Sequence, residues 1–308
     1  MTSLEFYNLI KSSFPFLPTS KQDLVLEKLS KFIFDKSKDN IFLLKGYAGT
    51  GKTTIIGSLV KNLWKIKKSS VLLAPTGRAA KVISNYSSSE AFTIHKKIYA
   101  PRIDKSGKIS FIISPNKHKN TIFIVDEASM ISDSSVQSNF FGSGSLLNDL
   151  IKYVYSGLQC KLLLIGDTAQ LPPVHLDLSP ALDCDTLELN FNKKVNELEL
   201  NEVVRQSQNS GILFNATMIR EAIAYKSYDS FQFKIDGFTD IVRLIDGYDI
   251  LDAINDSYSV QGNEETTFIV RSNKRANLYN QQIRSRVLFN DYEITAGDYL
   301  MIVKNNYF

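Results

Sequence analysis

Cysteine and histidine are scarce in this chain of 308 residues, which has two cysteines and three histidines. Cys160 and Cys184 do not form a Cys-x-x-Cys motif, so the sequence predicts neither a disulfide framework nor a zinc cluster. His118 and His175 have no partner residues at metal-ligand spacing, and we expect them to be structural or surface residues. This composition favours a reducing compartment, and we expect a cytoplasmic protein.

Long apolar runs are also missing. Neither end of the chain has the ~18 consecutive apolar residues of a membrane span, and the N-terminal segment lacks the pattern of a signal peptide. Hydrophobic residues make up 44% and charged residues 22%, which is typical of a globular protein with room for roughly two domains. The net charge of +4 permits a polyanionic partner without requiring one.

Four continuous apolar runs predict strands that are buried on both faces of a parallel sheet. The runs are residues 41–46, 70–76, 121–129 and 161–167. Helix-length segments separate them, one starting at Lys52 and one at about 78–86, and residues 20–34 also have nearly helical spacing. This alternation predicts an α/β fold with right-handed crossovers.

Residues 99–119 interrupt the alternation. Lys105-Ser106-Gly107 predicts a hairpin turn that is followed by a strand, so we expect a small β-hairpin insertion at about 99–120. Farther along, the pattern predicts a second domain with a helix around 210–225, a strand at 266–272, a helix from Lys274 to about Arg286 and a last strand at 296–308.

The strongest motif follows the first apolar run. Gly46 and Gly51-Lys52-Thr53 match the phosphate-loop pattern of glycine, four residues and Gly-Lys-Ser/Thr, between a predicted strand and a predicted helix. In such a loop, backbone N–H groups and the helix N-terminus hold phosphates. Lys52 would reach the β- and γ-phosphates of a nucleotide, and Thr53 would ligate Mg²⁺.

Two later strands also end in polar residues. Asp126 and Glu127 follow the third apolar run; Asp126 would hold Mg²⁺, and Glu127 can act as general base on water. Asp167 and Gln170 follow the fourth run, and the glutamine can sense the γ-phosphate or orient water. The local sequence leaves two alternatives open, which are solvated acids at a strand end and a loop stiffened by prolines.

In order and spacing, these motifs resemble those of superfamily 1 DNA helicases of the RecD-like branch, a group of P-loop ATPases. Residues 46–54 resemble motif I, 126–130 motif II and 166–174 motif III, while 74–82 resemble motif Ia and 93–98 the DNA-contacting segment after it. Residues 198–213 resemble the segment that supplies an arginine finger, and 268–284 the next motif of the second domain.

The resemblance implies a fold, a set of ligands and a set of site residues. Two RecA-like domains would close on Mg²⁺-ATP, and hydrolysis would drive 5′ to 3′ movement on single-stranded DNA with unwinding at duplex junctions. Catalytic roles fall on Lys52, Glu127, Gln170 and Arg205, and metal binding on Thr53 and Asp126. ATP binding falls on Gln22, which would read adenine, and on Gly46, Ala48, Gly49, Thr50, Gly51, Lys52, Thr53 and Thr54. DNA binding falls on Pro75, Thr76, Thr93, His95, Arg271, Asn273 and Phe111, the last as the wedge of a pin formed by the insertion.

Several of these residues have ordinary alternative roles. Thr93 and His95 can be a helix start with a satisfied histidine, and Arg205 can form a surface ion pair. Arg271 and Asn273 can be solvated. A kinase or GTPase is least favoured, since no Asn/Thr-Lys-x-Asp base-reading motif is present.

The later motifs of the helicase family do not appear in the sequence. We therefore expect a first RecA-like domain at 1–190 and part of a second at 191–308, which ends where an SH3-like insertion would begin, as in a fragment of a longer helicase. Two other hypotheses remain open: a module that binds nucleotide and DNA without turnover, and an RNA helicase of the same superfamily. The sequence does not identify a protein partner.

Overall fold

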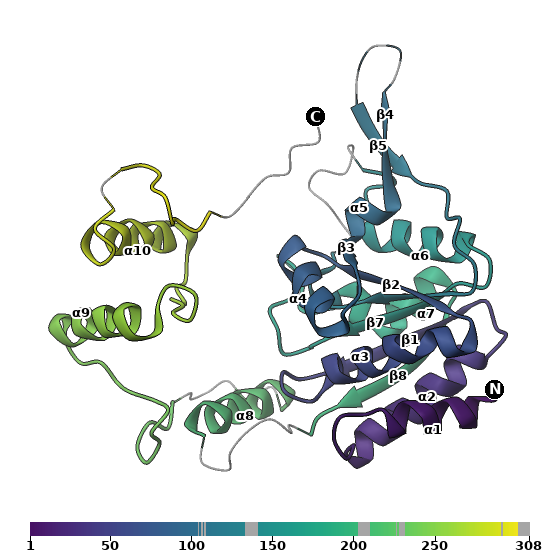
Figure 1. Cartoon of the computed structure of the whole chain (residues 1–308), viewed down its shortest axis with the longest axis horizontal. Helices are drawn as coiled ribbons and strands as arrows, with labels where there is room; N and C mark the ends of the chain where they lie inside the picture. Colours follow the sequence, from purple (N-terminus) through teal and green to yellow (C-terminus); the bar gives the residue numbers. More distant parts are fainter. Residues whose placement is uncertain are drawn as a thin grey trace. The chain divides into compact units, whose positions relative to one another are not determined.

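Six strands form one parallel sheet in the larger part of the protein, whose computed structural model is shown in Figure 1. The structure describes residues 1–103, 105, 107, 109–132, 141–202, 210–225, 227, 232–290 and 292–300. The strand order is β3-β2-β6-β7-β1-β8. The strands are β1 (Asn40–Gly46), β2 (Ser69–Ala74), β3 (Ala91–Thr93), β6 (Thr121–Val125), β7 (Lys161–Gly166) and β8 (Lys194–Leu200). This arrangement confirms the predicted α/β class.

The register of the sheet aligns the carboxyl ends of its central strands. Lys45 pairs with Gly166 of β7, and Gly46 pairs with Leu200 of β8. On the other side of β7, Val125 of β6 pairs with Leu164. The loops that follow β1, β6 and β7 therefore leave the sheet at one edge, which is where open α/β sheets bind ligands.

Helices cover both faces of this sheet. One face is covered by α1 (Ser3–Ser12), α2 (Ser20–Phe34), α3 (Lys52–Leu63) and α4 (Gly77–Ser87). The other is covered by α5 (Ile94–Ile98), α6 (Leu146–Ser156) and α7 (Cys184–Phe191). Within the described ranges, the helices are all too short or too polar to cross a bilayer.

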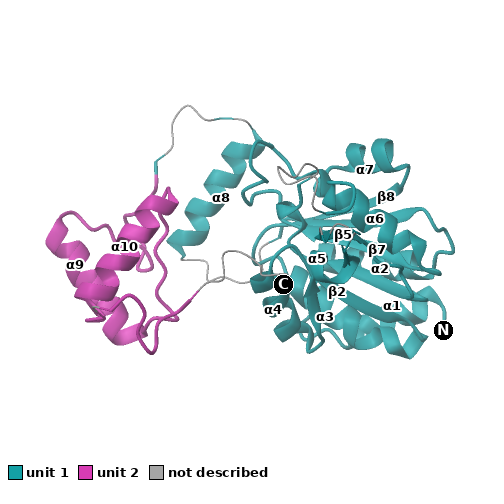
Figure 2. Ribbon diagram, turned by 90° about the horizontal axis from the view of Figure 1, so that it is seen from above, with its two compact units in different colours: residues 1–232 teal, residues 233–308 magenta. Residues whose placement is uncertain are grey.

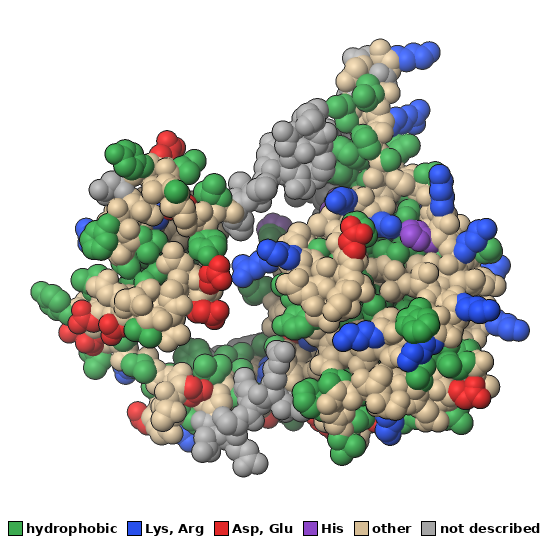
Figure 3. All heavy atoms as spheres, viewed as in Figure 1, with side chains coloured by type: hydrophobic (Ala, Val, Ile, Leu, Met, Phe, Trp, Pro, Cys, Tyr) green, Lys and Arg blue, Asp and Glu red, His purple; other side chains and the backbone are tan. Residues whose placement is uncertain are grey.

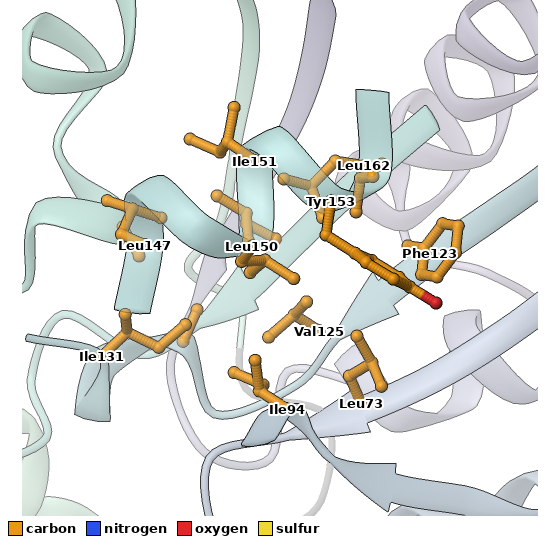
Figure 4. Packing of buried hydrophobic residues seen from close by; sticks show 14 of the residues in the cluster. Leu73, Ile94, Phe123, Val125, Ile131, Leu147, Leu150, Ile151, Tyr153 and Leu162 are labelled. Atoms are coloured by element: carbon orange, nitrogen blue, oxygen red, sulfur yellow. The ribbon is translucent and has the colours of Figure 1, made fainter. Parts of the chain in front are cut away.

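Alternate residues of each strand build two separate cores. Ile41 and Leu43 belong to one core, and Phe42 and Leu44 to the other, because successive side chains of a strand point to opposite faces. Figure 4 shows the first core, in which Val125 lies beside Leu150 of α6. The continuous apolar runs of the sequence thus reflect burial on both faces.

The predicted insertion is an antiparallel hairpin of β4 (Tyr99–Ile103) and β5 (Ile109–Ile113), although residues 104, 106 and 108 of its turn lie outside the described ranges. Its base is tied to α6 by a buried carboxylate. The Tyr99 hydroxyl donates to Asp149 Oδ2 at 2.7 Å, and the Ser143 N–H donates to the same oxygen at 2.9 Å. These contacts fix the start of the hairpin on the first core.

The chain divides into two compact units, residues 1–232 and 233–308 (Figure 2). The first contains the sheet, the hairpin and α8 (Gly211–Ala224). The second contains α9 (Gly247–Asp256), the helical turn Ser257–Gln261 and α10 (Asn273–Arg286). The sequence placed a domain boundary near residue 190, and β8 lies beyond that position while pairing with β1. The assignment of two RecA-like domains stays a prediction.

The second unit differs from its expected secondary structure. The helices predicted around 210–225 and from Lys274 are confirmed as α8 and α10. The predicted strand at 266–272 is wrong, because residues 266–271 have no ladder partner among the described residues and α10 begins at Asn273. An apolar run becomes a strand only where another strand pairs with its backbone. Residues 296–300 are not a strand either, and 301–308 lie outside the described ranges.

Replacing Leu164 by alanine should lower the free energy of unfolding by about 2–5 kcal/mol, because its fully buried side chain in β7 would leave a cavity. Leu171 is 90% exposed, and its replacement by alanine is the matched control, with an expected change within about 0.5 kcal/mol. Urea denaturation followed by circular dichroism measures both. Equal effects of the two replacements would contradict this burial pattern.

Candidate nucleotide-binding site

The loop between β1 and α3 has the backbone shape of a phosphate loop. Gly49 and Gly51 have φ angles of 80° and 89°, in the left-handed region that favours glycine. A Cβ atom on Gly51 would collide with the side-chain amide of Gln22. Gly51 is also the N-cap of α3 and has no side chain to accept the first N–H groups of that helix. Those groups are therefore available to an anion.

Lys52 stands at the start of α3, inside the loop. Its Nζ donates to the carbonyl oxygens of Gly46 at 2.5 Å and Tyr47 at 2.9 Å. Burial lowers the pKa of Lys52, and the negative charges of Asp167, Asp126 and Glu127 oppose this shift. Three acids from two different strand ends therefore act on one ammonium group. Residues that lie far apart in the sequence, in three separate motifs, are thus close together in the structure.

The two acids after β6 lie in a desolvated position. Asp126 Oδ1 accepts a hydrogen bond from the backbone N–H of Glu127 at 3.0 Å. Burial raises the pKa of Asp126, and burial together with the charge of Asp126 raises the pKa of Glu127. A carboxylate whose pKa is raised is a stronger proton acceptor, as a general base requires. Glu127 has a φ of 54°, so the chain turns sharply at this residue.

Gln170 is held against Glu127 by a residue whose role the sequence did not reveal. The Ser129 hydroxyl donates to Gln170 Oε1 at 3.1 Å, and Gln170 lies near enough to Glu127 to oppose the rise in the pKa of that carboxyl. Asp167, which is almost fully buried, accepts from the Ala169 N–H at 2.8 Å and shapes the turn that carries Gln170. Ser129 lies within the segment 126–130 that resembles motif II, but its contact with Gln170 depends on the pairing of β6 with β7.

Gln22 braces the loop from α2. Its Oε1 accepts from the Thr19 N–H at 3.1 Å, and its Nε2 donates to the Thr50 carbonyl at 2.9 Å. The glutamine thus completes the capping box of α2 and holds the loop at the same time. Reading of adenine by Gln22 stays a prediction.

An arginine that the sequence did not indicate also reaches the loop. Arg220 of α8 lies over the ring of Tyr47, with its guanidinium carbon 4.9 Å from the ring centroid. Arg220 lies inside a predicted helix, so the sequence placed it on a helix but could not show which face would meet the loop. Arg205, the predicted arginine finger, lies outside the described residues.

The remaining ATP-site residues belong to the same segment. Ala48 lies in the loop, and Thr53 and Thr54 lie in the first turn of α3.

The predicted DNA-binding residues are divided between the two units. Pro75 precedes Thr76, and Thr76 and Thr93 are the N-caps of α4 and α5, whose hydroxyls accept from the backbone at 3.2 Å. His95 packs between Tyr99 and Phe141, and burial lowers its pKa.

Phe111, Arg271 and Asn273 have very different surroundings. Phe111 is only 8% exposed and stacks on Phe141, with 4.7 Å between the ring centroids. A wedge must be exposed, so this burial argues for a packing role at the base of the hairpin. Arg271 and Asn273 are exposed in the second unit. The DNA-binding roles of all these residues stay predictions.

Replacing Gly51 by alanine should weaken nucleotide binding by about tenfold or more, because it strains a left-handed backbone and displaces Gln22. Gly57 in α3 is the matched control, since a Cβ there would meet only the Tyr86 carbonyl at an ordinary 3.6 Å. Titration with a fluorescent ATP analogue measures both affinities. Unchanged binding by the Gly51 variant would show that this loop is not the nucleotide site.

The family comparison covers most of the first unit. A family model described as an AAA domain matches residues 32–227, which include the whole phosphate loop and the strand ends at Asp126 and Asp167. This match extends over more than half of the chain.

Curated relatives extend the similarity toward both ends. The uncharacterized protein R530 of Acanthamoeba polyphaga mimivirus is 28% identical over 94% of this chain and 60% of its own length. The ATP-dependent DNA helicase dda of Enterobacteria phage T4 is 25% identical over 87% of this chain and 57% of its own length. The chain therefore spans somewhat more than half the length of these relatives.

Among solved structures, the Pif1 helicase from Bacteroides in complex with ADP-AlF3 and ssDNA is 18% identical, with a TM-score of 0.41 over 87% of this chain and 57% of that one. The resemblance seen in the motifs is confirmed as distant homology to superfamily 1 helicases. By the extent of the family match, this chain belongs to the AAA domain family.

Proposed function

We propose that this chain hydrolyses ATP at the carboxyl edge of its sheet and couples hydrolysis to 5′ to 3′ movement on single-stranded DNA. One observation carries the proposal: Lys52, the acids Asp126 and Glu127, and the Glu127 partner Gln170 converge beside the phosphate loop. The dda protein of phage T4, a distant relative, is an ATP-dependent DNA helicase, and this supports the choice of reaction.

Each residue of the cluster has a distinct task in this proposal. The N–H groups at the start of α3 and the ammonium of Lys52 bind the phosphates. Glu127 accepts a proton from water, and its raised pKa suits that task. Gln170 orients the same water, and the Ser129 hydroxyl holds the glutamine in place.

The residues present also fit a magnesium ion bound together with the nucleotide. Thr53, in the first turn of α3, would supply a hydroxyl, and Asp126, whose charge acts on Lys52, would supply a carboxylate. Within the described ranges no three His, Cys, Asp or Glu side chains form a metal cluster, so phosphate oxygens and water would supply the remaining ligands. When bound, magnesium offsets negative charge that develops on the phosphates.

A second RecA-like domain that begins after β8 would complete the proposed helicase. Its Arg205 would act as the arginine finger, a group that can be worth ~10³–10⁵ in rate. Single-stranded DNA would pass over Thr76 and Thr93, the N-caps of α4 and α5. The hairpin would split the duplex, and its exposed side chains Ile103 and Ile112 fit the wedge better than the buried Phe111.

Oligo-dT should stimulate steady-state ATP hydrolysis by the wild-type chain. Lys52→Ala should abolish both binding and turnover, because it removes the ammonium at the phosphates. Glu127→Gln should retain ATP binding and lose about 10²–10⁴ in turnover rate, because the general base is removed. Phosphate release and analogue binding measure the two properties separately.

Glu27→Gln is the matched control for the charge change, since Glu27 lies on α2 and pairs only with Lys31 in the described part of the chain. It should turn over ATP at the wild-type rate. If the Glu127 variant keeps wild-type turnover, the proposed mechanism is wrong. If the wild type binds ATP without hydrolysing it, the chain is a nucleotide-binding module instead.

Gln22→Ala separates two roles of one residue. If Gln22 reads adenine, the variant should weaken ATP binding by about tenfold and leave GTP binding nearly unchanged. If Gln22 only braces Thr50, both nucleotides should weaken equally, because the loop itself is disturbed. Competition of ATP and GTP against one fluorescent analogue distinguishes the two. A variant that binds both nucleotides like the wild type would contradict either role.

A further inference from the structure

Positive charge is concentrated in one segment of the chain. Residues 40–125 contain 15 Lys and Arg but only two acidic residues, Glu90 and Asp104, whereas the whole chain has 36 basic and 32 acidic residues. The segment therefore carries +13, and the rest of the chain carries −9. A modest net charge conceals this separation, and the strongly basic part can attract a polyanion.

Part of this charge surrounds the single tryptophan of the chain. Trp64 directly follows α3, and its side chain is 70% exposed. The Nζ atom of Lys65 lies 6.0 Å from the centroid of the Trp64 ring. Lys61 and Lys67 are exposed on either side of it in the sequence. A large aromatic surface is thus presented to solvent among cations.

A second basic stretch meets the first at the edge of the sheet. The Ser69 N–H donates to the Asn120 carbonyl at 3.2 Å, and Ser69 pairs with Thr121 in the register of β2 with β6. This brings the exposed Lys117 and Lys119 to the edge that carries Trp64. Five exposed lysines of this region share one property: none of their side chains forms a hydrogen bond or an ion pair with the described part of the chain. They are Lys61, Lys65, Lys67, Lys117 and Lys119.

We name this group of five lysines and Trp64 the tryptophan face. In Figure 3, Lys and Arg side chains gather over the part of the larger unit where α3 ends and β2 begins in Figure 1, and few acidic side chains lie among them. The face is separate from the nucleotide site. Lys52 begins α3 and Trp64 follows its end, so a helix of 12 residues, about 18 Å long, lies between them.

We propose that the tryptophan face is a second binding site for single-stranded nucleic acid, on the edge of the sheet opposite the nucleotide. The lysines would contact phosphates, and the indole of Trp64 would stack on a base. The site does not depend on hydrolysis, and only its preference for single-stranded DNA rests on the function proposed above.

The aromatic ring decides between two kinds of polyanion. Lysines alone would suit an acidic peptide as well as a nucleic acid, because both carry closely spaced negative charge. An exposed indole adds a surface on which every base can stack, and such stacking is sequence-tolerant. A face that combines the two matches a backbone that alternates phosphates with bases.

Because Trp64 is the only tryptophan, its intrinsic fluorescence reports directly on the face. Titration of the full chain with oligo-dT should quench this fluorescence saturably. The double variant Lys65→Glu/Lys67→Glu should shift the midpoint of quenching about tenfold toward higher DNA concentration. The slope of the logarithm of the binding constant against the logarithm of the salt concentration should also become less steep, by about 0.7 for each phosphate that the variant no longer neutralises.

Lys28→Glu is the matched control, since Lys28 is an exposed lysine of α2 outside the tryptophan face. Its midpoint should equal that of the wild type. Trp64→Ala should weaken binding of labelled oligo-dT, measured by anisotropy, by about fivefold or more because the indole no longer stacks on a base.

Two outcomes would overturn the proposal. If oligo-dT stimulates ATP hydrolysis while Trp64 fluorescence does not change, the face is not a DNA site, and the function proposed above still holds. If polyglutamate quenches Trp64 with the same affinity and salt dependence as oligo-dT, the face binds acidic chains by charge alone. Saturable quenching without any ATP hydrolysis would support the second site and contradict the proposed enzyme.

Discussion

The parallel alignment of β1, β6 and β7 is the constraint on which the site depends. Three strands that are distant in the sequence end at one edge of the sheet, and each is followed by residues of the candidate nucleotide-binding site. These residues are Lys52, Asp126, Glu127, Asp167 and Gln170. Their strand segments are mainly apolar and buried on both faces, so hydrophobic burial fixes the register. A shift of one residue would exchange the two cores and move Asp126 and Asp167 away from Lys52.

Electrostatics within the cluster follows from that alignment. Burial alone would lower the pKa of Lys52 and raise the pKa values of Asp126 and Glu127, and the opposite charges of the lysine and the acids partly offset this desolvation. Removing one of the acids would leave the buried positive charge of Lys52 with less opposite charge around it, so a change at one of these residues affects the others. Gln22 and Arg220 add support from α2 and α8, which links the shape of the loop to two helices outside the sheet.

Charge is also distributed at a larger scale. The segment from β1 to β6 holds both the phosphate loop and the tryptophan face, and almost all of its charged residues are basic. The two lie at opposite ends of α3.

The sequence by itself determined the α/β class, the β4–β5 hairpin and the position of the phosphate loop, because these depend on local periodicity and on glycine conformations. It missed β8, whose alternating charged residues are typical of an edge strand, and it predicted a strand at 266–272 that has no partner in the described part of the chain. Only the tertiary structure decided that Ser129 holds Gln170, that Arg220 stacks on Tyr47 and that Phe111 is buried. These contacts join residues that are far apart in the chain, and only packing and strand pairing decide which of them meet.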